Sequence, residues 1–314
     1  LGRPLSLTAE SDLNQPSVVA PTDAGGLGMT AQWADDVHHA VHALVTGERH
    51  GYYVDFGTLD VLAKALTGAF VHDGDYSTFR GRTWGAPVPP EISGHAFVVS
   101  VQNHDQVGNR ALGDRPSRVL SDGQLAIEAA LILAGPFTPM LFMGEEWGSR
   151  TPFQFFTDFT DPALGEAVRE GRTREFGSHG WDKLYGGTVQ VPNPQAESTF
   201  AASKLDWSEP ASPAHARMLA FYRALIALRR TVPEIGSGDR AATWLTYDSD
   251  DPAWFVMHRG GAAVAVNLGS HAREVPLAGA DGRKVLLAWE PVTLTSDGVS
   301  MPAHDVVILG PEGS

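Results

Sequence analysis

Short apolar runs alternate with amphipathic segments along the first half of the chain. Residues 4–10, 28–33, 96–102 and 140–143 are rich in apolar side chains and read as short buried strands. Helical periodicity follows at 35–46, at 59–67 and at 125–134, where Ser121 and Gln124 have capping-box spacing. Strands that alternate with helices in this way predict parallel strand–helix units.

The second half of the chain changes character. Residues 152–207 carry Gly, Pro, Asp and aromatic residues without a clean period, so we expect a long surface excursion there. A strong helix is predicted over 213–230, and short β-type runs follow at 254–258, 262–267, 284–287 and 306–309. We therefore expect an α/β domain over residues 1–232 and a small antiparallel β domain over 233–314.

Composition and net charge exclude several classes of partner and binding site for this chain. The chain has 314 residues, 43% of them hydrophobic, a net charge of -14 and no cysteine. This charge argues against nucleic acid or an anionic membrane surface as partner, and the absence of cysteine excludes disulfides and thiolate metal sites. No apolar run reaches the roughly 20 residues of a membrane-spanning helix. The expectation is a cytoplasmic protein with a neutral ligand, and the missing initiator Met suggests a larger parent chain.

Polar side chains follow the predicted strands at their carboxyl ends, where parallel strand–helix units collect their chemistry. Glu10 follows the first strand and Asp105 the third. Two carboxylates in different surroundings can divide acid and electrostatic roles at neutral pH. The alternative is that Glu10 is a surface carboxylate and Asp105 a turn or capping residue.

Several neighbours of these carboxylates could bind sugar hydroxyls or rings. Asn103, His104 and Gln106 offer amide and imidazole hydrogen-bonding groups, although a satisfied polar turn would use the same residues. The rings of Trp33, Tyr52 and Tyr53 could present flat apolar faces to glucose units, with core packing as an equal alternative.

A family resemblance rests on several motifs that occur in one order. The segment Gln102-Asn-His-Asp-Gln-Val-Gly-Asn-Arg110 resembles the seventh-strand motif of the α-amylase superfamily of glycoside hydrolases. Together with Ala9-Glu-Ser-Asp-Leu-Asn14 and Ala31-Gln-Trp-Ala-Asp-Asp-Val-His-His39, it is more similar to the malto-oligosyltrehalose trehalohydrolases within that superfamily. The similarity continues through Leu141-Phe-Met-Gly-Glu-Glu-Trp147 to Lys204-Leu-Asp-Trp207.

The resemblance implies roles for the candidate residues. Glu10 matches the general acid/base after the fifth strand of a (β/α)8 barrel, Asp105 the transition-state stabiliser after the seventh, and His104 a ligand of sugar hydroxyls. The family's nucleophilic Asp ends the fourth strand, which would precede residue 1. We therefore expect the C-terminal half of the barrel, strands five to eight, as a fragment inactive alone. Asp12 is expected to contact substrate.

The segment from Asp35 to His42 admits two interpretations. His38 and His42 stand at i and i+4 on one helix face and could bind a metal, but no zinc-protease pattern accompanies them. The resemblance implies instead that Gln32, Asp36 and His39 help to shape sugar subsites. We expect no metal and no cofactor.

The implied reaction is retaining hydrolysis of the α-1,4 bond beside the trehalose end of an α-glucan oligosaccharide, which releases trehalose. The implied partners are that oligosaccharide and the N-terminal half of the parent chain. One alternative is a glycogen branching enzyme of the same superfamily, and another is a non-catalytic glucan-binding fragment.

Overall fold

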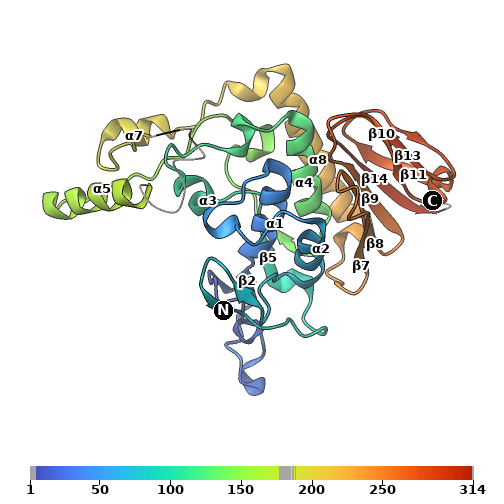
Figure 1. Ribbon diagram of the computed structural model, residues 1–314, viewed down its shortest axis with the longest axis horizontal. Coiled ribbons are helices and arrows are strands. Elements are labelled where there is room, and N and C mark those ends of the chain that lie inside the picture. The colour runs from blue at the N-terminus through green and yellow to red at the C-terminus, as the bar shows by residue number, and fades with distance from the viewer. Residues whose placement is uncertain (1–4, 177–184, 186, 188, 313–314) are drawn as a thin grey trace.

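The computed structural model describes residues 5–176, 185, 187 and 189–312 (Figure 1). The predicted strand at 4–10 therefore begins outside the described residues. The helices are α1 (Asp35–Thr46), α2 (Leu59–Gly68), α3 (His104–Gly108), α4 (Asp122–Ala134), α5 (Pro162–Phe176), α7 (Glu197–Ala202), α8 (Pro213–Thr231) and α9 (Pro233–Gly236). The strands are β1 (Thr8–Ala9), β2 (Ala31–Trp33), β3 (Tyr76–Ser77), β4 (Arg82–Thr83), β5 (Phe97–Val99), β6 (Thr138–Pro139), β7 (Thr243–Tyr247), β8 (Trp254–Arg259), β9 (Ala262–Asn267), β10 (Arg273–Pro276), β11 (Arg283–Ala288), β12 (Thr293–Leu294), β13 (Gly298–Met301) and β14 (Asp305–Glu312).

Four short parallel strands form the sheet that carries the site. Their order is β1-β2-β5-β6, and every neighbouring pair is parallel. Sequence order and spatial order agree. Helices α1 and α2 lie between β2 and β5, and α3 and α4 lie between β5 and β6, whereas short 3-10 turns and loops connect β1 to β2. The predicted parallel strand–helix units are confirmed.

The fourth predicted strand is displaced. The sequence places it at 140–143, whereas β6 covers Thr138–Pro139 and pairs with Val98 and Val99. Pairing ends after the N–H of Met140 bonds the carbonyl of Val99, at 2.8 Å. The side chains of Leu141 and Met143 are exposed, so their apolar character does not mark a buried strand.

Helices α1, α2, α4 and α8 supply much of the main hydrophobic core. The predicted capping box is present at α4, where the Ser121 side chain accepts from the backbone of Gln124 and the Gln124 side chain binds back. Met218, Phe221, Tyr222 and Leu225 form the buried face of α8. These contacts explain why the amphipathic pattern located the helices correctly.

The C-terminal part is antiparallel, as predicted. Strands β11-β14-β9-β8-β7 form one sheet and β10-β13-β12 another, and a separate apolar cluster fills the space between the two sheets. A two-residue turn at Gly260 and Gly261 joins β8 to β9, and Gly260 has φ +57°. The buried guanidinium of Arg259 donates to the carbonyl of Ala134 and ties this part to the end of α4.

The segment 152–207 contains two helices that the sequence pattern did not predict. Figure 1 shows α5 and α7 extending away from the parallel sheet and its helices. Polar residues cover most of α5, and it has few buried side chains, Arg172 and Phe176 among them. Within the described residues, no helix is both long and apolar enough to cross a membrane.

Candidate active site

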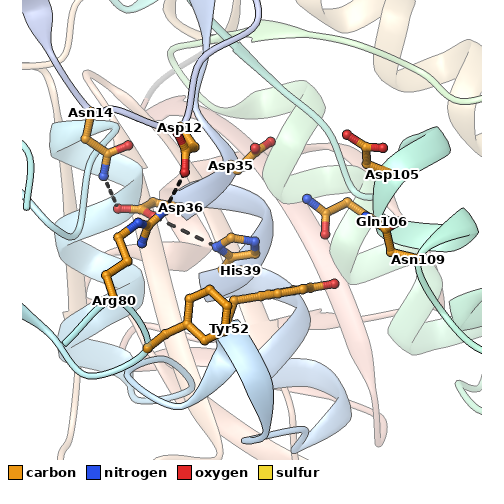
Figure 2. Close-up of a pocket in the computed structure, with 11 residues that line it drawn as sticks. Asp12, Asn14, Asp35, Asp36, His39, Tyr52, Arg80, Asp105, Gln106 and Asn109 are labelled. Atoms are coloured by element: carbon orange, nitrogen blue, oxygen red, sulfur yellow. Dashed lines mark hydrogen bonds and ion pairs between the residues drawn. The ribbon is translucent and has the colours of Figure 1, made fainter. Parts of the chain in front are cut away.

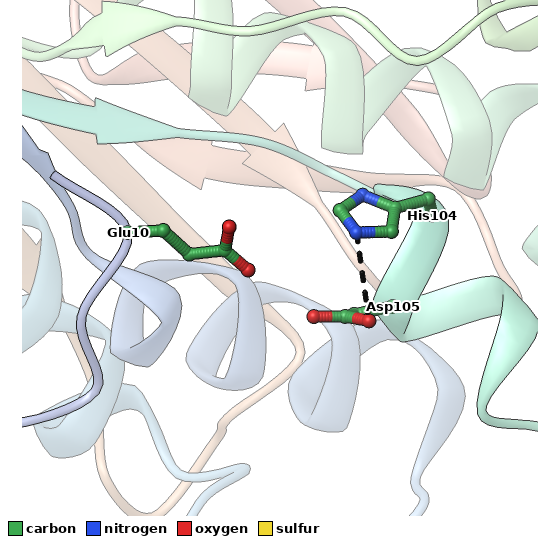
Figure 3. Close-up of side chains that lie close together, drawn as sticks. All are labelled: Glu10, His104 and Asp105. Atoms are coloured by element: carbon green, nitrogen blue, oxygen red, sulfur yellow. Dashed lines mark ion pairs between the residues drawn. The ribbon is translucent and has the colours of Figure 1, made fainter. Parts of the chain in front are cut away.

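Three side chains converge beside the carboxyl ends of β1 and β5. Glu10 directly follows β1, and His104 and Asp105 begin α3. One ligand atom of each residue lies within 4.8 Å of one atom of each of the other two. Nε2 of His104 is 3.6 Å from Oδ1 of Asp105. Figure 3 shows Glu10 reaching from its loop toward the pair on α3, and all three side chains are exposed, so a ligand can reach them.

Asn103 sets the start of α3. Its Oδ1 accepts a hydrogen bond from the N–H of Gln106 at 2.8 Å, which is an N-cap. Asn103 is 2% exposed, so its side chain caps and orients the helix from the protein interior and does not contact a ligand directly. The side chain of Gln106, on the next turn, does line the neighbouring pocket.

A pocket of about 180 Å³ opens next to Asp105. Figure 2 shows its two sides: α3 contributes one, and α1 with the loop after β1 contributes the other. Five residues predicted as site members line it, namely Asp12, Asp36, His39, Tyr52 and Gln106, together with the catalytic candidate Asp105. Asn14, Asp35, Phe79, Arg80 and Asn109 complete the lining.

The carboxylates of α1 have different surroundings. Burial raises the pKa of Asp35, and the nearby charges of Asp36, Asp105 and Glu10 add to that rise, while His39 opposes it. Burial alone would also raise the pKa of Asp36, but the imidazole of His39, 3.9 Å away, and the hydrogen bond from the backbone N–H of His72 outweigh burial and lower it. Asp36 therefore stays ionised and accepts hydrogen bonds within the fold, whereas the pKa of Asp35 depends on the charges of the neighbouring site residues.

Aromatic rings and one ion pair border the pocket. The ring of Tyr52 lies 4.9 Å from that of His39 and 6.1 Å from that of Phe79, measured between centroids. Burial raises the pKa of Tyr52 to about 12, so its hydroxyl keeps its proton. Arg80, on the hairpin between β3 and β4, lies 3.4 Å from Asp12. Apolar faces and hydrogen-bonding groups thus stand side by side, which suits a sugar.

Besides Glu10, Asn103 and His104, three more predicted site residues lie outside this pocket lining, namely Gln32, Trp33 and Tyr53. Gln32 is fully buried, and its Nε2 donates to the carbonyl of Gln15. Tyr53 is 1% exposed, and its ring packs at 4.5 Å from that of Tyr52. Trp33 is half-buried, and its ring stands roughly perpendicular to that of His104, with 6.1 Å between the two centroids. Trp33 can support His104, while Gln32 and Tyr53 belong to the packing behind the site.

Two histidines of α1, His38 and His42, form hydrogen bonds through their rings. Nδ1 of His38 lies 2.6 Å from the carbonyl of Val101, and its Nε2 lies 3.0 Å from the hydroxyl of Tyr53. Nε2 of His42 lies 2.9 Å from Oε2 of Glu48. Burial lowers the pKa of both imidazoles. Both nitrogens of His38 are used inside the protein, so a metal at the i, i+4 pair would have to displace these bonds. Among the described residues, Glu10, His104 and Asp105 are the one group whose spacing could hold an ion.

The sequence did not predict five of the lining residues, namely Asn14, Asp35, Phe79, Arg80 and Asn109. Asp35 was visible as the first residue of a helix directly after a strand, a position at the carboxyl edge of the sheet. Phe79 and Arg80 had no comparable signal, because the hairpin that carries them consists of two-residue strands far along the chain from Asp12.

Two curated relatives of this chain carry the same enzyme name. The chain is 50% identical over 310 residues to the malto-oligosyltrehalose trehalohydrolase of Rhizobium sp. (strain M-11), covering 98% of this chain and 50% of that protein. It is 46% identical over 314 residues to the enzyme of the same name from Mycobacterium tuberculosis, covering 98% and 52% respectively. The chain therefore spans about half the length of the curated relatives it matches.

Structural and family comparisons agree. The crystal structure of a putative alpha amylase from Salmonella typhimurium superposes with a TM-score of 0.81 at 34% identity, covering 98% of this chain and 51% of that one. Residues 242–308 match the family described as a domain of unknown function, DUF3459. The match lies within the antiparallel part of the fold and assigns it no activity.

Proposed function

We propose, from the premise that this chain belongs to the malto-oligosyltrehalose trehalohydrolase family, that it forms the part of a retaining α-glucan hydrolase that carries the acid and the stabilising carboxylate. The observation that carries the proposal is the convergence of Glu10, His104 and Asp105 within 4.8 Å, beside a pocket lined by polar and aromatic side chains. The proposed substrate is a malto-oligosaccharide with a trehalose end, cleaved to release trehalose.

In this proposal Glu10 protonates the oxygen of the scissile α-1,4 bond while a carboxylate outside these 314 residues bonds the anomeric carbon. Glu10 then takes a proton from the water that hydrolyses this glycosyl–enzyme bond. Asp105 remains ionised and stabilises the positive charge that develops on the sugar ring. The retaining course rests on the family resemblance, because the separation that distinguishes retention from inversion is that between the acid and the nucleophile, and not that between Glu10 and Asp105. His104 would bond a sugar hydroxyl, and Trp33 would brace its ring.

The pocket would hold a glucose unit next to the cleaved bond. Gln106 and Asp12 offer hydrogen-bonding groups, and Tyr52 with His39 offers apolar faces. Several carboxylates surround this space, and a negative field favours an oxocarbenium-like transition state over the neutral ground state. The pocket thus serves recognition and charge stabilisation together.

We place the nucleophile of the reaction outside these 314 residues, in a strand that pairs with the free edge of β1. The four parallel strands would then be strands five to eight of a (β/α)8 barrel. The exposure of Leu5 and Leu7, 63% and 64%, beside that edge supports this placement, because such side chains face the interior or the helices in a closed barrel. The partner of this edge would be the N-terminal half of the same protein.

Product analysis tests the proposal. The protein as encoded is incubated with maltooligosyltrehalose, with and without an added α-glucan acceptor, and the products are separated by chromatography. Free trehalose that forms at the same rate in both reactions supports a hydrolase. New α-1,6 branch points that require the acceptor would instead identify a branching enzyme, and an absence of turnover would leave a glucan-binding role.

A further inference from the structure

The segment from Val101 to Arg110 carries the proposed stabiliser Asp105 and its neighbour His104 but has little internal support. Its only helix, α3, has five residues, too few to be stable without outside contacts. The side chain of Asp105 is half exposed, and its ion-pair contact within the described part of the chain is with His104, at 3.6 Å. The position of the Asp105 carboxylate is therefore set by the backbone of the segment and by whatever holds that backbone.

The first end of the segment is held by His38. A carbonyl oxygen only accepts, so the 2.6 Å contact means that Nδ1 of His38 carries the proton and donates it to Val101. Nε2 is then the acceptor for the hydroxyl of Tyr53, at 3.0 Å. His38 is 2% exposed, and this pair of bonds fixes both its tautomer and its ring orientation.

The other end of the segment is held by Glu48, just beyond the C-terminus of α1. Arg110 donates from Nη1 and Nη2 to the two oxygens of Glu48, at 2.9 and 3.0 Å, in a bidentate pair. His42 contacts the same carboxylate at 2.9 Å, and Asp114 accepts from Nε of Arg110 at 2.8 Å. Side-chain exposure of Arg110 and Glu48 is 7% and 10%, so solvent screens this pair little.

We propose that His38 and Glu48 are positioning residues, which hold the two ends of the segment 101–110 and thereby fix Asp105 opposite Glu10. Both anchors belong to α1 and the turn that follows it, so one rigid element sets both ends. The histidines that sequence reasoning weighed as a metal pair thus acquire a different role: His38 holds one end directly, and His42 supports the other through Glu48. This inference rests on the proposed function and concerns how its geometry is maintained.

Further bonds steady the middle and the flank of the segment without replacing the anchors. Nη2 of Arg172 donates to the carbonyl of Gly108 at 2.8 Å, and Arg115 donates to the side chain of Gln102 at 3.1 Å. Loss of one anchor is therefore expected to shift the segment rather than unfold it. A shift of about 1 Å at a reacting group is enough to slow catalysis by roughly 100-fold.

The test compares turnover with stability in the protein as encoded. The variants are His38→Leu, which removes the donor, His38→Asn, which keeps an N–H near the Nδ1 position, and Glu48→Gln. The control is Arg259→Lys, because Arg259 is equally buried and binds backbone carbonyls, but lies in the antiparallel part of the fold. kcat, KM for maltooligosyltrehalose and the thermal unfolding midpoint are measured for each.

We expect kcat to fall at least about tenfold in His38→Leu and Glu48→Gln with KM changed less than about threefold, and His38→Asn to recover part of the loss. Arg259→Lys should lower the unfolding midpoint and leave kcat unchanged. The inference would be overturned if both anchor variants kept the wild-type kcat. It would also be overturned if Arg259→Lys lost as much kcat, relative to its drop in unfolding midpoint, as the anchor variants do. If Glu48→Gln does not fold, Glu48→Asp takes its place. A wild-type protein without turnover would instead reject the proposed function.

Discussion

Nδ2 of Asn14 donates a hydrogen bond to Oδ2 of Asp36 at 2.8 Å, and this contact joins the loop after β1 to the first turn of α1. The same carboxylate oxygen accepts from the N–H groups of Val71 and His72, at 2.7 and 2.9 Å. Asn14 has φ +52°, a left-handed conformation that Asn tolerates better than most residues. One buried carboxylate therefore fixes three separate segments at the base of the pocket.

Replacement of Asn14 by Ala should lower the free energy of unfolding by about 1–3 kcal/mol, because it removes a donor to a buried carboxylate and places Ala at positive φ. Urea unfolding followed by tryptophan fluorescence measures the change. Asn109→Ala is the matched control, since Asn109 lines the same pocket and its side chain forms no hydrogen bond with the described residues. An effect of Asn14→Ala no larger than that of the control would contradict this role.

Glu145 should make stability depend on pH. Burial raises its pKa to about 8, with the charge of Glu146 adding to the rise, so the folded state binds a proton that the unfolded state releases near pH 4.5. Stability from this group is complete below pH 4.5 and is lost as pH rises toward and through 8. The loss should amount to a few kcal/mol, on the order of 1.4 kcal/mol per unit of pKa difference.

The free energy of unfolding is measured for the wild type and for Glu145→Gln at several pH values from about 5 to about 9, which covers most of the range between the unfolded and folded pKa values. The variant should lose stability less steeply with rising pH. Some slope should remain, because burial also raises the pKa of Glu128 well above its ordinary value. Identical slopes in the two proteins would show that Glu145 is ionised in the folded state.

Tyr52 should contribute to glucan binding through its ring. Tyr52→Ala is expected to weaken the affinity for a malto-oligosaccharide by roughly 5- to 10-fold, corresponding to about 1 kcal/mol of aromatic contact. Isothermal titration calorimetry with maltoheptaose provides the measurement. The control is Tyr76→Ala, since Tyr76 is 63% exposed and does not line the pocket. Equal affinities of the two variants would remove Tyr52 from the binding surface.

The edge of β1 should make the isolated 314-residue chain associate. Leu5, Leu7 and Leu27 are 63%, 64% and 65% exposed, and unpaired strand edges promote pairing between chains. Light scattering should detect oligomers at micromolar concentration, and Leu5→Lys with Leu7→Lys should reduce them. A monodisperse monomer of the wild-type chain would show that this edge needs no partner.

Much of the fold followed from local patterns. The periodicity of α1 and the capping box of α4 are properties of a few adjacent residues, and both predictions are confirmed. The prediction of a strand at 140–143 is wrong because Leu141 and Met143 are apolar yet exposed. The sequence pattern did not predict α5 because most of its side chains face solvent. Pattern reasoning detects burial, and it fails where an element forms without burial or where apolar residues stay outside.

The site was predictable where it follows strands. Glu10 and Asp105 stand directly after or near strand ends, and the two lie together as that position predicted. Arg80 and Phe79 reach the pocket from a hairpin, and the pairing of Arg80 with Asp12 spans 68 residues of sequence, which no local pattern encodes. The hydroxyl of Tyr53 bonds His38, a contact that depends on the packing of α1 against the segment around Tyr53.

The most direct test is the rate of trehalose release from maltooligosyltrehalose by the protein as encoded, compared with its Glu10→Gln and Asp105→Asn variants. Asp23→Asn is the control, because Asp23 is an exposed carboxylate in the loop after β1. Loss of the acid should slow release by about 10²–10⁴-fold and loss of the stabiliser by about 10²–10³-fold, with the control unchanged. Wild-type rates in both site variants would contradict the assignment of Glu10 and Asp105.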